Sequence, residues 1–142
     1  MTSKPHKIII TGAASGFGSF LAEYLLDKSE KLFLIDINSD GLQKFNGLEG
    51  INIFNCDLTD YVQTTAVIKE IFEEEPEIDI LINNAGIIHS ELLINFFNRP
   101  DRRHSKENWD KMLNVNLTTV FNCSVNVIDN MIRNKACSKQ SY

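Results

Sequence analysis

The amino-acid sequence predicts an α/β fold, a doubly wound parallel sheet whose four strands run in the order 3-2-1-4. Two observations lead to this prediction. Short apolar runs rich in β-branched residues alternate with helical patterns, and each run stays apolar along its length, as strands buried on both faces do. A glycine-rich turn joins the first run to the first helical pattern. We expect a single domain over residues 1–142 with a polar tail over 135–142.

The predicted strands each end where polar or turn-forming residues begin. They span Lys7–Thr11, Lys31–Ile35, Ile51–Phe54 and Ile78–Ile82. Gly12 follows the first strand, Asp36 the second and Asn83 the fourth.

Three helical patterns lie between and after these strands. The first covers residues 20–26, the second begins after Thr59 or Asp60, either of which can cap it, and the third begins at Ser105. The stripe expected to be buried on the second helix is Val62, Ala66 or Val67, and Ile71. The corresponding stripe on the third helix is Trp109, Leu113, Leu117, Val120, Ser124, Val127 and Met131.

The composition excludes several classes of protein. A chain of 142 residues with 43% hydrophobic and 23% charged residues is globular, not disordered. Its net charge of −5 argues against nucleic-acid and membrane-surface partners, which favour a basic surface. The sequence has no secretory signal and no apolar run long enough to cross a membrane. Three cysteines without a C-x-x-C pair then predict reduced thiols and a cytoplasmic protein.

The turn from Thr11 to Gly18 is the expected phosphate-binding site. Gly12 permits a tight turn, Gly16 allows the backbone to approach a pyrophosphate, and Gly18 allows the helix to pack close to the strand. Free N–H groups at the start of the helix would hold the anion. The spacing is G-x-x-x-G-x-G, and a merely connecting turn is the alternative. The position between strand and helix favours binding.

Asp36 indicates which dinucleotide would bind. It ends the second strand, 18 residues after Gly18, where a carboxylate can accept hydrogen bonds from an adenosine ribose. A carboxylate repels a 2′-phosphate, and residues 37–43 contain no arginine. We therefore expect NAD to be preferred over NADP. The alternative is that Asp36 caps a turn over residues 38–41.

Together these residues resemble the short-chain dehydrogenase/reductase family, whose fold is of the Rossmann type. The resemblance covers residues 7 to about 134. The motifs that carry it are Thr11-Gly12-x-x-x-Gly16-x-Gly18, Cys56-Asp57-Leu58, Asn83-Asn84-Ala85-Gly86, Trp109-Asp110 and Val115-Asn116-Leu117. The resemblance implies cofactor contacts from Gly12, Ser15, Gly16, Phe17, Gly18, Asp36, Ile37, Asp57, Leu58, Asn84, Ala85 and Gly86.

The family also implies individual roles. Asp57 would meet the adenine amino group, and residues 83–86 would stabilise the sheet and line the nicotinamide ribose. Asn116 would be the member of the catalytic tetrad whose backbone carbonyl holds a water in the proton relay. The alternative is an exposed helix asparagine, but an amide inside an apolar stripe favours the functional role. The helix over 106–134 would pack against another subunit in a homo-oligomer.

The reaction of the family is hydride transfer between a nicotinamide and a small alcohol or carbonyl substrate. It uses a serine and a Tyr-x-x-x-Lys segment that follow the long helix. The chain reaches Tyr142 without them, and the Tyr24–Lys28 match lies on the first helix. We expect the chain to be a cofactor-binding portion that is truncated after the helix of residues 106–134, which matches the long fifth helix of the family. We expect this portion to be inactive. The alternative is a non-catalytic dinucleotide-binding or regulatory subunit that pairs with full-length relatives.

The segment 87–108 is longer than the corresponding connection of the family. Its basic residues, Arg99, Arg102, Arg103 and Lys106, would suit either an entrance for an anionic substrate or a solvated insertion. His89 and His104 have no partner at metal-ligand spacing, so no metal site is expected.

Overall fold

The fold is a three-layer α/β sandwich around one parallel sheet. The computed structural model describes residues 5–97 and 101–139 of the chain. The sheet order β3-β2-β1-β4 confirms the predicted order 3-2-1-4. The strands are β1 (Lys7–Thr11), β2 (Lys31–Asp36), β3 (Ile51–Asn55) and β4 (Ile80–Ile82).

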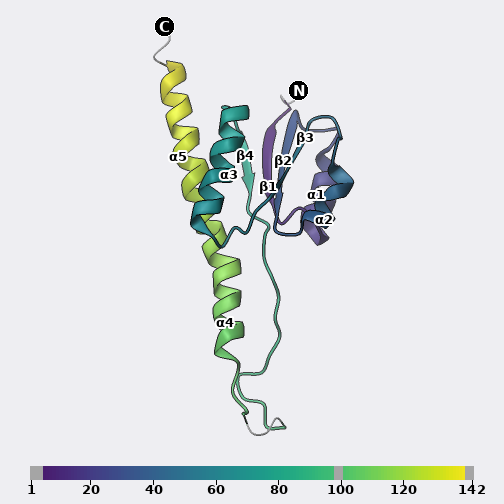
Figure 1. Ribbon diagram of the computed structural model, residues 1–142, viewed down its shortest axis with the longest axis vertical. Helices are drawn as coiled ribbons and strands as arrows, with labels where there is room; N and C mark the ends of the chain where they lie inside the picture. The colour runs from purple at the N-terminus through teal and green to yellow at the C-terminus, as the bar shows by residue number, and fades with distance from the viewer. Residues whose placement is uncertain (1–4, 98–100, 140–142) are drawn as a thin grey trace.

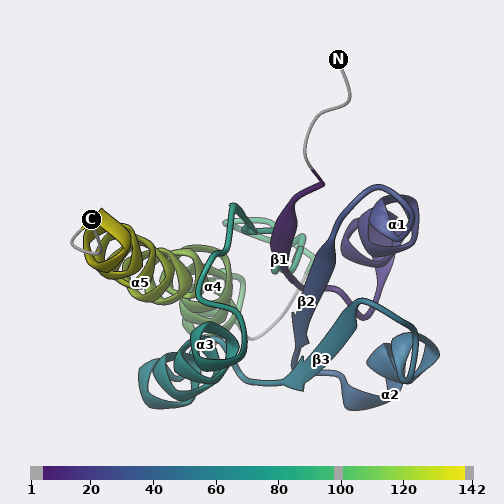
Figure 2. The ribbon, with the colours of Figure 1, turned by 90° about the horizontal axis from the view of Figure 1, so that it is seen from above.

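Helices cover both faces of the sheet, with α1 and α2 on one face and α3 and α5 on the other (Figures 1 and 2). Their bounds are α1 (Gly16–Leu25), α2 (Ser39–Leu42), the 3₁₀ turn η1 (Gln43–Phe45), α3 (Tyr61–Glu74), α4 (Lys106–Leu113), the π turn η2 (Asn114–Thr118) and α5 (Thr119–Lys139). No helix in the described part of the chain is long and apolar enough to cross a membrane.

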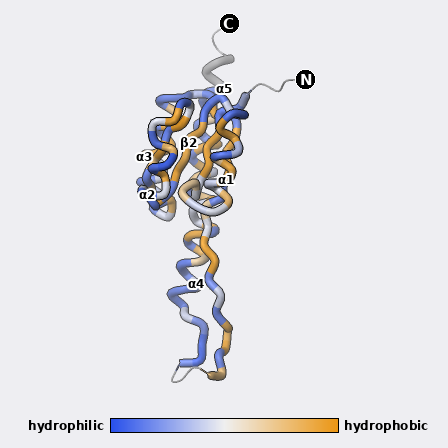
Figure 3. Tube along the Cα trace, turned by 90° about the vertical axis from the view of Figure 1, so that its right-hand side faces the viewer, coloured by the Kyte–Doolittle hydropathy of each residue, from blue (hydrophilic) through white to orange (hydrophobic). Residues whose placement is uncertain are grey.

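The central strands are apolar on both faces because each face has its own core. Successive side chains of a strand point to opposite faces. Ile9 and Phe33 therefore pack toward α3 and α5, whereas Ile8 and Ile10 pack toward α1 and α2. The hydropathy colours follow this pattern, with apolar strands inside more polar helices (Figure 3). The apolar runs thus correctly predicted four parallel strands. β1 and β2 are buried, whereas β3 and β4 at the two edges are only partly buried, and β4 begins at Ile80 and not at the predicted Ile78.

The second predicted helix is present, but its predicted buried stripe was partly wrong. Asp60 caps α3 by accepting hydrogen bonds from the amides of Val62 (2.8 Å) and Gln63 (3.0 Å). Val62 points outward and is 76% exposed, because it lies two residues, about 200° of helix rotation, before the buried Thr64. The residues buried on α3 are Thr64, Ile68, Ile71 and Phe72.

The stripe predicted for the long helix is buried only in its second half. Val127 packs against α3, but Trp109 is 50% and Leu117 is 62% exposed. The reason is that α4 projects beyond the sheet, past the end of the facing layer (Figure 1). The helix continues to Lys139, so residues 135–139 of the expected tail are helical; residues 140–142 lie outside the described residues.

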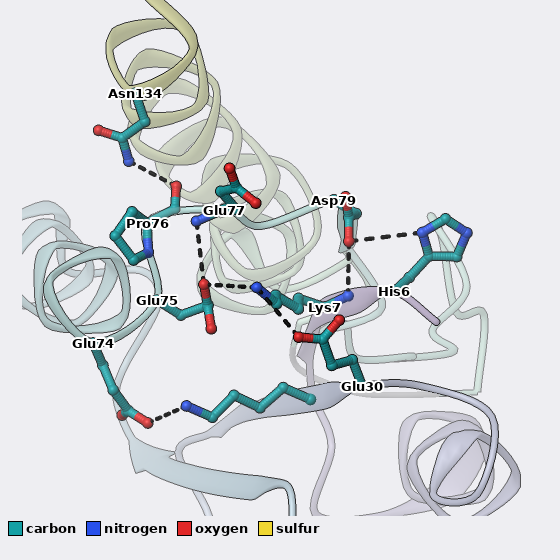
Figure 4. Close-up of polar contacts among 10 residues, drawn as sticks. His6, Lys7, Glu30, Glu74, Glu75, Pro76, Glu77, Asp79 and Asn134 are labelled. Atoms are coloured by element: carbon teal, nitrogen blue, oxygen red, sulfur yellow. Dashed lines mark hydrogen bonds and ion pairs between the residues drawn. The ribbon is translucent and has the colours of Figure 1, made fainter. Parts of the chain in front are cut away.

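A network of ion pairs closes the edge of the sheet where the strands begin (Figure 4). The Nζ of Lys7 lies 2.9 Å from Oε1 of Glu75 and 3.4 Å from Oε1 of Glu30. The backbone N–H of Lys7 donates to Oδ2 of Asp79 at 2.9 Å. The hydrogen bond to Glu75 raises the pKa of Lys7, which therefore stays charged. Asn134 of α5 donates to the carbonyl of Pro76 at 2.8 Å, joining the helix to this edge.

Two buried thiols give a test of the core between the sheet and α5. Cys56 and Cys123 are free and buried, and burial raises the pKa of Cys123 from 9.0 to about 12 because a thiolate loses its hydration there. In a Cys137→Ser background, we expect a thiol reagent at pH 8 to label neither cysteine until the chain unfolds. Native-state labelling at the rate of a peptide thiol would contradict this packing.

The same shift predicts a pH dependence of stability. Since the pKa of Cys123 is higher in the folded chain, the neutral thiol stabilises the fold at pH values below 9. This contribution is lost as the pH rises from 9 toward 12, so the free energy of unfolding should fall over that range. Denaturant unfolding of a Cys123→Ala variant provides the control, because its stability should fall less steeply.

Candidate functional site

The site is built on a set of hydrogen bonds between the ends of β1 and β4. Oγ1 of Thr11 accepts from the backbone amides of Asn84 (3.0 Å) and Ala85 (3.1 Å). The Nδ2 of Asn84 donates to the carbonyls of Thr11 (3.1 Å) and Gly12 (3.2 Å). The turn after β1 is therefore fixed against the strip of residues 83–86 that follows β4.

Close backbone approach explains the glycines of this turn. Gly12 has a φ of +67°, and a Cβ there would lie 2.7 Å from Cα of Ala85. A Cβ at Gly18 would lie 2.1 Å from the carbonyl oxygen of Gly12 and 2.4 Å from Nδ2 of Asn84. Gly16 has a φ of +53° and faces open space, with no described atom within 4 Å of a Cβ built there. The turn thus leaves room for a ligand at Gly16.

The start of α1 adds backbone donors beside this space. Ser15 is the N-cap in an extended conformation, and its side chain makes no capping hydrogen bond among the described residues. The first amides of a helix have no partner within the helix and carry the positive end of its dipole. Phe17, 66% exposed, stacks on Phe20 at the outside of the turn. The arrangement suits a phosphate group.

The carboxylate of Asp36 accepts hydrogen bonds from the backbone of two turns, the glycine turn after β1 and the turn after β2. Its Oδ2 accepts from the amide of Ala14 and its Oδ1 from the amide of Asn38, both at 2.9 Å. The bond from Asn38 supports the alternative interpretation, in which the carboxylate stabilises the turn that follows β2, and contact with a ribose stays a prediction. Each carboxylate oxygen can accept a second hydrogen bond, so ribose hydroxyls can still bind. Ile37 is exposed beside it.

The loop of residues 56–60, between β3 and α3, forms the next part of the edge. Oδ1 of Asp57 accepts from the amide (2.9 Å) and the hydroxyl (2.7 Å) of Thr59. The side chain of Leu58 lies in the core, so only its backbone can face a ligand. Sequence reasoning missed Asn122, which is 2% exposed and donates from Nδ2 to the carbonyl of Leu58 at 2.9 Å.

Asn116 pairs with the backbone of the residue that follows the strip. Its Oδ1 accepts from the amide of Ile87 (2.8 Å), and its Nδ2 donates to the carbonyl of Ile87 (2.9 Å). The π turn η2 contains Asn116, and such turns occur frequently at functional sites. Both ends of the side-chain amide are therefore engaged in positioning the strip. Gly86 is close, because a Cβ there would lie 3.1 Å from Oδ1 of Asn116.

The segment after the strip forms an arm that projects away from the sheet (Figure 1). Ile94 and Arg103 form an isolated antiparallel bridge within it. At its base, Nε2 of His89 lies 3.1 Å from Oε2 of Glu91, and hydrogen bonds from Asn108 and His89 lower the pKa of that carboxylate. Residues 5–97 and 101–139 contain no group of three His, Cys, Asp or Glu side chains suited to a metal ion.

A family model described as short chain dehydrogenase matches residues 6–138. The chain belongs to this family. Its members are oxidoreductases that bind a nicotinamide dinucleotide, which agrees with the Rossmann-type sheet and the glycine turn. The residues that the motifs predict for the cofactor lie along the edge described above, and their part in binding stays a prediction.

Individual relatives place the chain within the family. It is 34% identical to a 3-oxoacyl-(acyl-carrier-protein) reductase of Buchnera aphidicola over 128 residues, covering 89% of this chain and 49% of the relative. The aldohexose dehydrogenase of Thermoplasma acidophilum has a similar structure, with a TM-score of 0.72, 29% identity, and coverage of 92% of this chain and 46% of that one.

The 3-ketoacyl-(acyl-carrier-protein) reductase from Brucella melitensis, solved with NADH, shares the fold with a TM-score of 0.79 at 24% identity. The match covers 94% of this chain and 53% of that one. The chain spans about half the length of the curated relatives it matches.

The close approach at Gly18 makes a strong prediction. Gly18→Ala should lower the free energy of unfolding by about 3 kcal/mol, because its Cβ would overlap backbone atoms that cannot move independently. The matched control is Gly47→Ala, where φ is +76° but the space is open. Backbone strain alone should cost that variant about 1 kcal/mol. Urea unfolding measures both, and equal losses would contradict the described packing.

Proposed function

We propose that this chain binds NAD along the carboxyl edge of its sheet, as the cofactor-binding half of a short-chain dehydrogenase. The enzyme would transfer hydride between the nicotinamide and an alcohol or carbonyl group of a small molecule. The observation that carries the proposal is the double hydrogen bonding of Thr11 with Asn84. It brings the phosphate turn, which begins at Gly12, next to the strip that would line the nicotinamide ribose.

Each part of the edge would hold one part of the dinucleotide. The backbone of Gly12–Gly18 would bind the pyrophosphate, helped by the start of α1 and the hydroxyl of Ser15. Asp36 and Ile37 would meet the adenosine ribose, and Asp57 the adenine. Asn84–Gly86 would line the nicotinamide ribose. When bound, the nicotinamide would supply or accept the hydride.

Binding without turnover is the second part of the proposal. Asn116 is the member of the family's tetrad that this chain carries near the strip. Tyr24 has a lysine four residues on, but it lies on α1, whereas α5, which begins three residues after Asn116, lies on the opposite face of the sheet (Figure 2). Nζ of Lys28 also covers the ring of Tyr24 at 3.7 Å. This pair would not reach a substrate at the nicotinamide. A 142-residue chain with these groups is therefore proposed to bind the cofactor and leave the substrate unchanged.

Asp36 makes the preference for NAD testable. The wild-type chain should bind NAD more tightly than NADP in calorimetric titrations, because the carboxylate repels a 2′-phosphate. Asp36→Asn removes the charge and keeps one oxygen to accept from the amide of Ala14, while its Nδ2 cannot accept from the amide of Asn38. In this variant we expect the ratio of the Kd for NADP to the Kd for NAD to fall about tenfold, which corresponds to about 1.4 kcal/mol of binding free energy.

The matched control is Asp40→Asn, an acidic residue on α2 four positions away. It should leave the ratio of the two affinities unchanged. Absence of binding at millimolar NAD would reject the proposed function. Conversion of NAD to NADH with a panel of secondary alcohols would reject only the proposed lack of turnover.

A second function is supported by the outer face of α4 and α5. Leu113, Leu117, Phe121, Ile128 and Ile132 recur at helical spacing and are all exposed. An apolar stripe of this kind is typical of a contact between subunits. The alternative proposal is a non-catalytic subunit that pairs through the helix of residues 106–134 with a second copy or a full-length relative.

The free thiols of Cys56 and Cys123 support a cytoplasmic location.

Sedimentation of the purified chain tests this pairing. If the stripe is the contact, the wild type should sediment as a dimer, and Phe121→Lys should shift it toward monomer by burying a charge in the interface. Tyr61→Lys is the control, because Tyr61 is an exposed aromatic residue on α3. A monomeric wild type, or equal effects of the two substitutions, would reject the proposed contact.

A further inference from the structure

One buried amide joins α5 to the loop of residues 56–60. Asn122 lies among apolar neighbours on the inner face of α5, beside Cys123, and is 2% exposed. Its Nδ2 donates to the carbonyl of Leu58 at 2.9 Å and also lies 3.4 Å from the carbonyl of Thr59. An apolar side chain would satisfy the packing here, whereas burying an amide needs hydrogen-bond partners. The contact with the loop supplies them.

The opposite side of the same loop is held by β2. The amide of Cys56 donates to the carbonyl of Asp36 at 3.0 Å, and Nδ2 of Asn55 donates to the same carbonyl at 3.2 Å. The loop therefore lies between a strand that ends at Asp36 and a helix that reaches it through Asn122. Asp57 and Thr59 close their own turn between these two attachments.

The helix that holds this loop also holds the strip at the other end of the site. Asn116 binds both backbone groups of Ile87 in the π turn, and Asn122 binds Leu58 six residues later. One continuous helix thus fixes the distance between the strip and the loop. In the proposed mode of binding, these are the nicotinamide end and the adenine end of the site.

We propose that Asn122 is a positioning residue for the dinucleotide, because it sets the position of the loop that presents Asp57 to the adenine. The inference rests on the proposed function. It acts through the backbone of Leu58 and requires no contact between Asn122 and the ligand. Its effect should therefore be confined to the adenine end.

The informative variant is Asn122→Leu, which keeps the size of the side chain and removes the donor. The fold should tolerate it, because the hydroxyl of Thr64, which lies 2.7 Å from the carbonyl of Asp60 and 3.3 Å from that of Leu58, can turn its proton to Leu58 when the Asn122 donor is removed. Asn126→Leu is the matched control: the same substitution one turn later on α5, where Nδ2 donates only within the helix, to the carbonyl of Asn122. Asn122→Ser is a smaller second variant, and thermal melting checks that each is folded.

The test titrates the full 142-residue chain with ADP-ribose and, separately, with nicotinamide mononucleotide, followed by NMR chemical shifts. For both variants of Asn122 we expect the Kd for ADP-ribose to rise about fivefold, with the Kd for nicotinamide mononucleotide unchanged within twofold. Asn126→Leu should change neither. A merely structural role would weaken both ligands together, and that result, or no change at all, would overturn the inference.

A measurement without ligand separates this inference from the proposed function. The amide of Thr59 is hydrogen bonded to Asp57 in the loop. Its hydrogen exchange should speed up about fivefold in both variants of Asn122 and remain unchanged in Asn126→Leu. If the wild type binds no dinucleotide, the proposed function fails, and with it the role of Asn122 in binding. Unchanged exchange together with normal binding by the wild type overturns the inference alone.

Discussion

The hydrogen bonds between Thr11 and the strip after β4 are the constraint on which the rest of the site depends. In a parallel sheet, adjacent strands end at the same edge, but their loops diverge unless something holds them together. Here the buried hydroxyl of Thr11 accepts hydrogen bonds from the backbone amides of Asn84 and Ala85. The side-chain amide of Asn84 donates to the carbonyls of Thr11 and Gly12. This contact leaves no room for a side chain at Gly12 or Gly18. The glycines of the turn follow from the same contact that fixes the strip.

Asparagine side chains make further hydrogen bonds of this kind, from a side chain to a backbone, around the same edge. A primary amide has a donor and an acceptor in the same arrangement as a peptide group, so it can pair with a backbone that has no strand beside it. Asn84 pairs with the end of β1, Asn116 with Ile87, and Asn122 with the loop after β3. Asn83 reaches Ser124 on α5. These side chains thereby join the loops at the edge to the strands and helices beside them.

The sequence predicted the sheet and the glycine turn because those features depend on local pattern. Apolar runs indicated the strands, and the glycine spacing indicated the turn. Which helix residues are buried was harder to predict, because burial depends on which other elements pack against each part of the helix. Val62 lies on the side of α3 that faces away from the sheet, and Leu117 lies in η2, directly after the projecting helix α4. Asn122, like Asn116, is an asparagine within the apolar pattern of the long helix, but only Asn116 belongs to a motif that the sequence analysis used.

The long helix of residues 106–139 is attached to the rest of the molecule at three levels, and this limits how it can move. Asn116 of η2 binds Ile87, Asn122 in the first turn of α5 binds Leu58, and Asn134 binds Pro76 at the opposite edge of the sheet. Sliding the helix by one turn, about 5.4 Å, would break all of these contacts together. We therefore expect the helix to keep its position when a ligand binds, so that rearrangement is limited to side chains and single loops. The chain would then lose on folding much of the conformational entropy that a mobile site loses on binding.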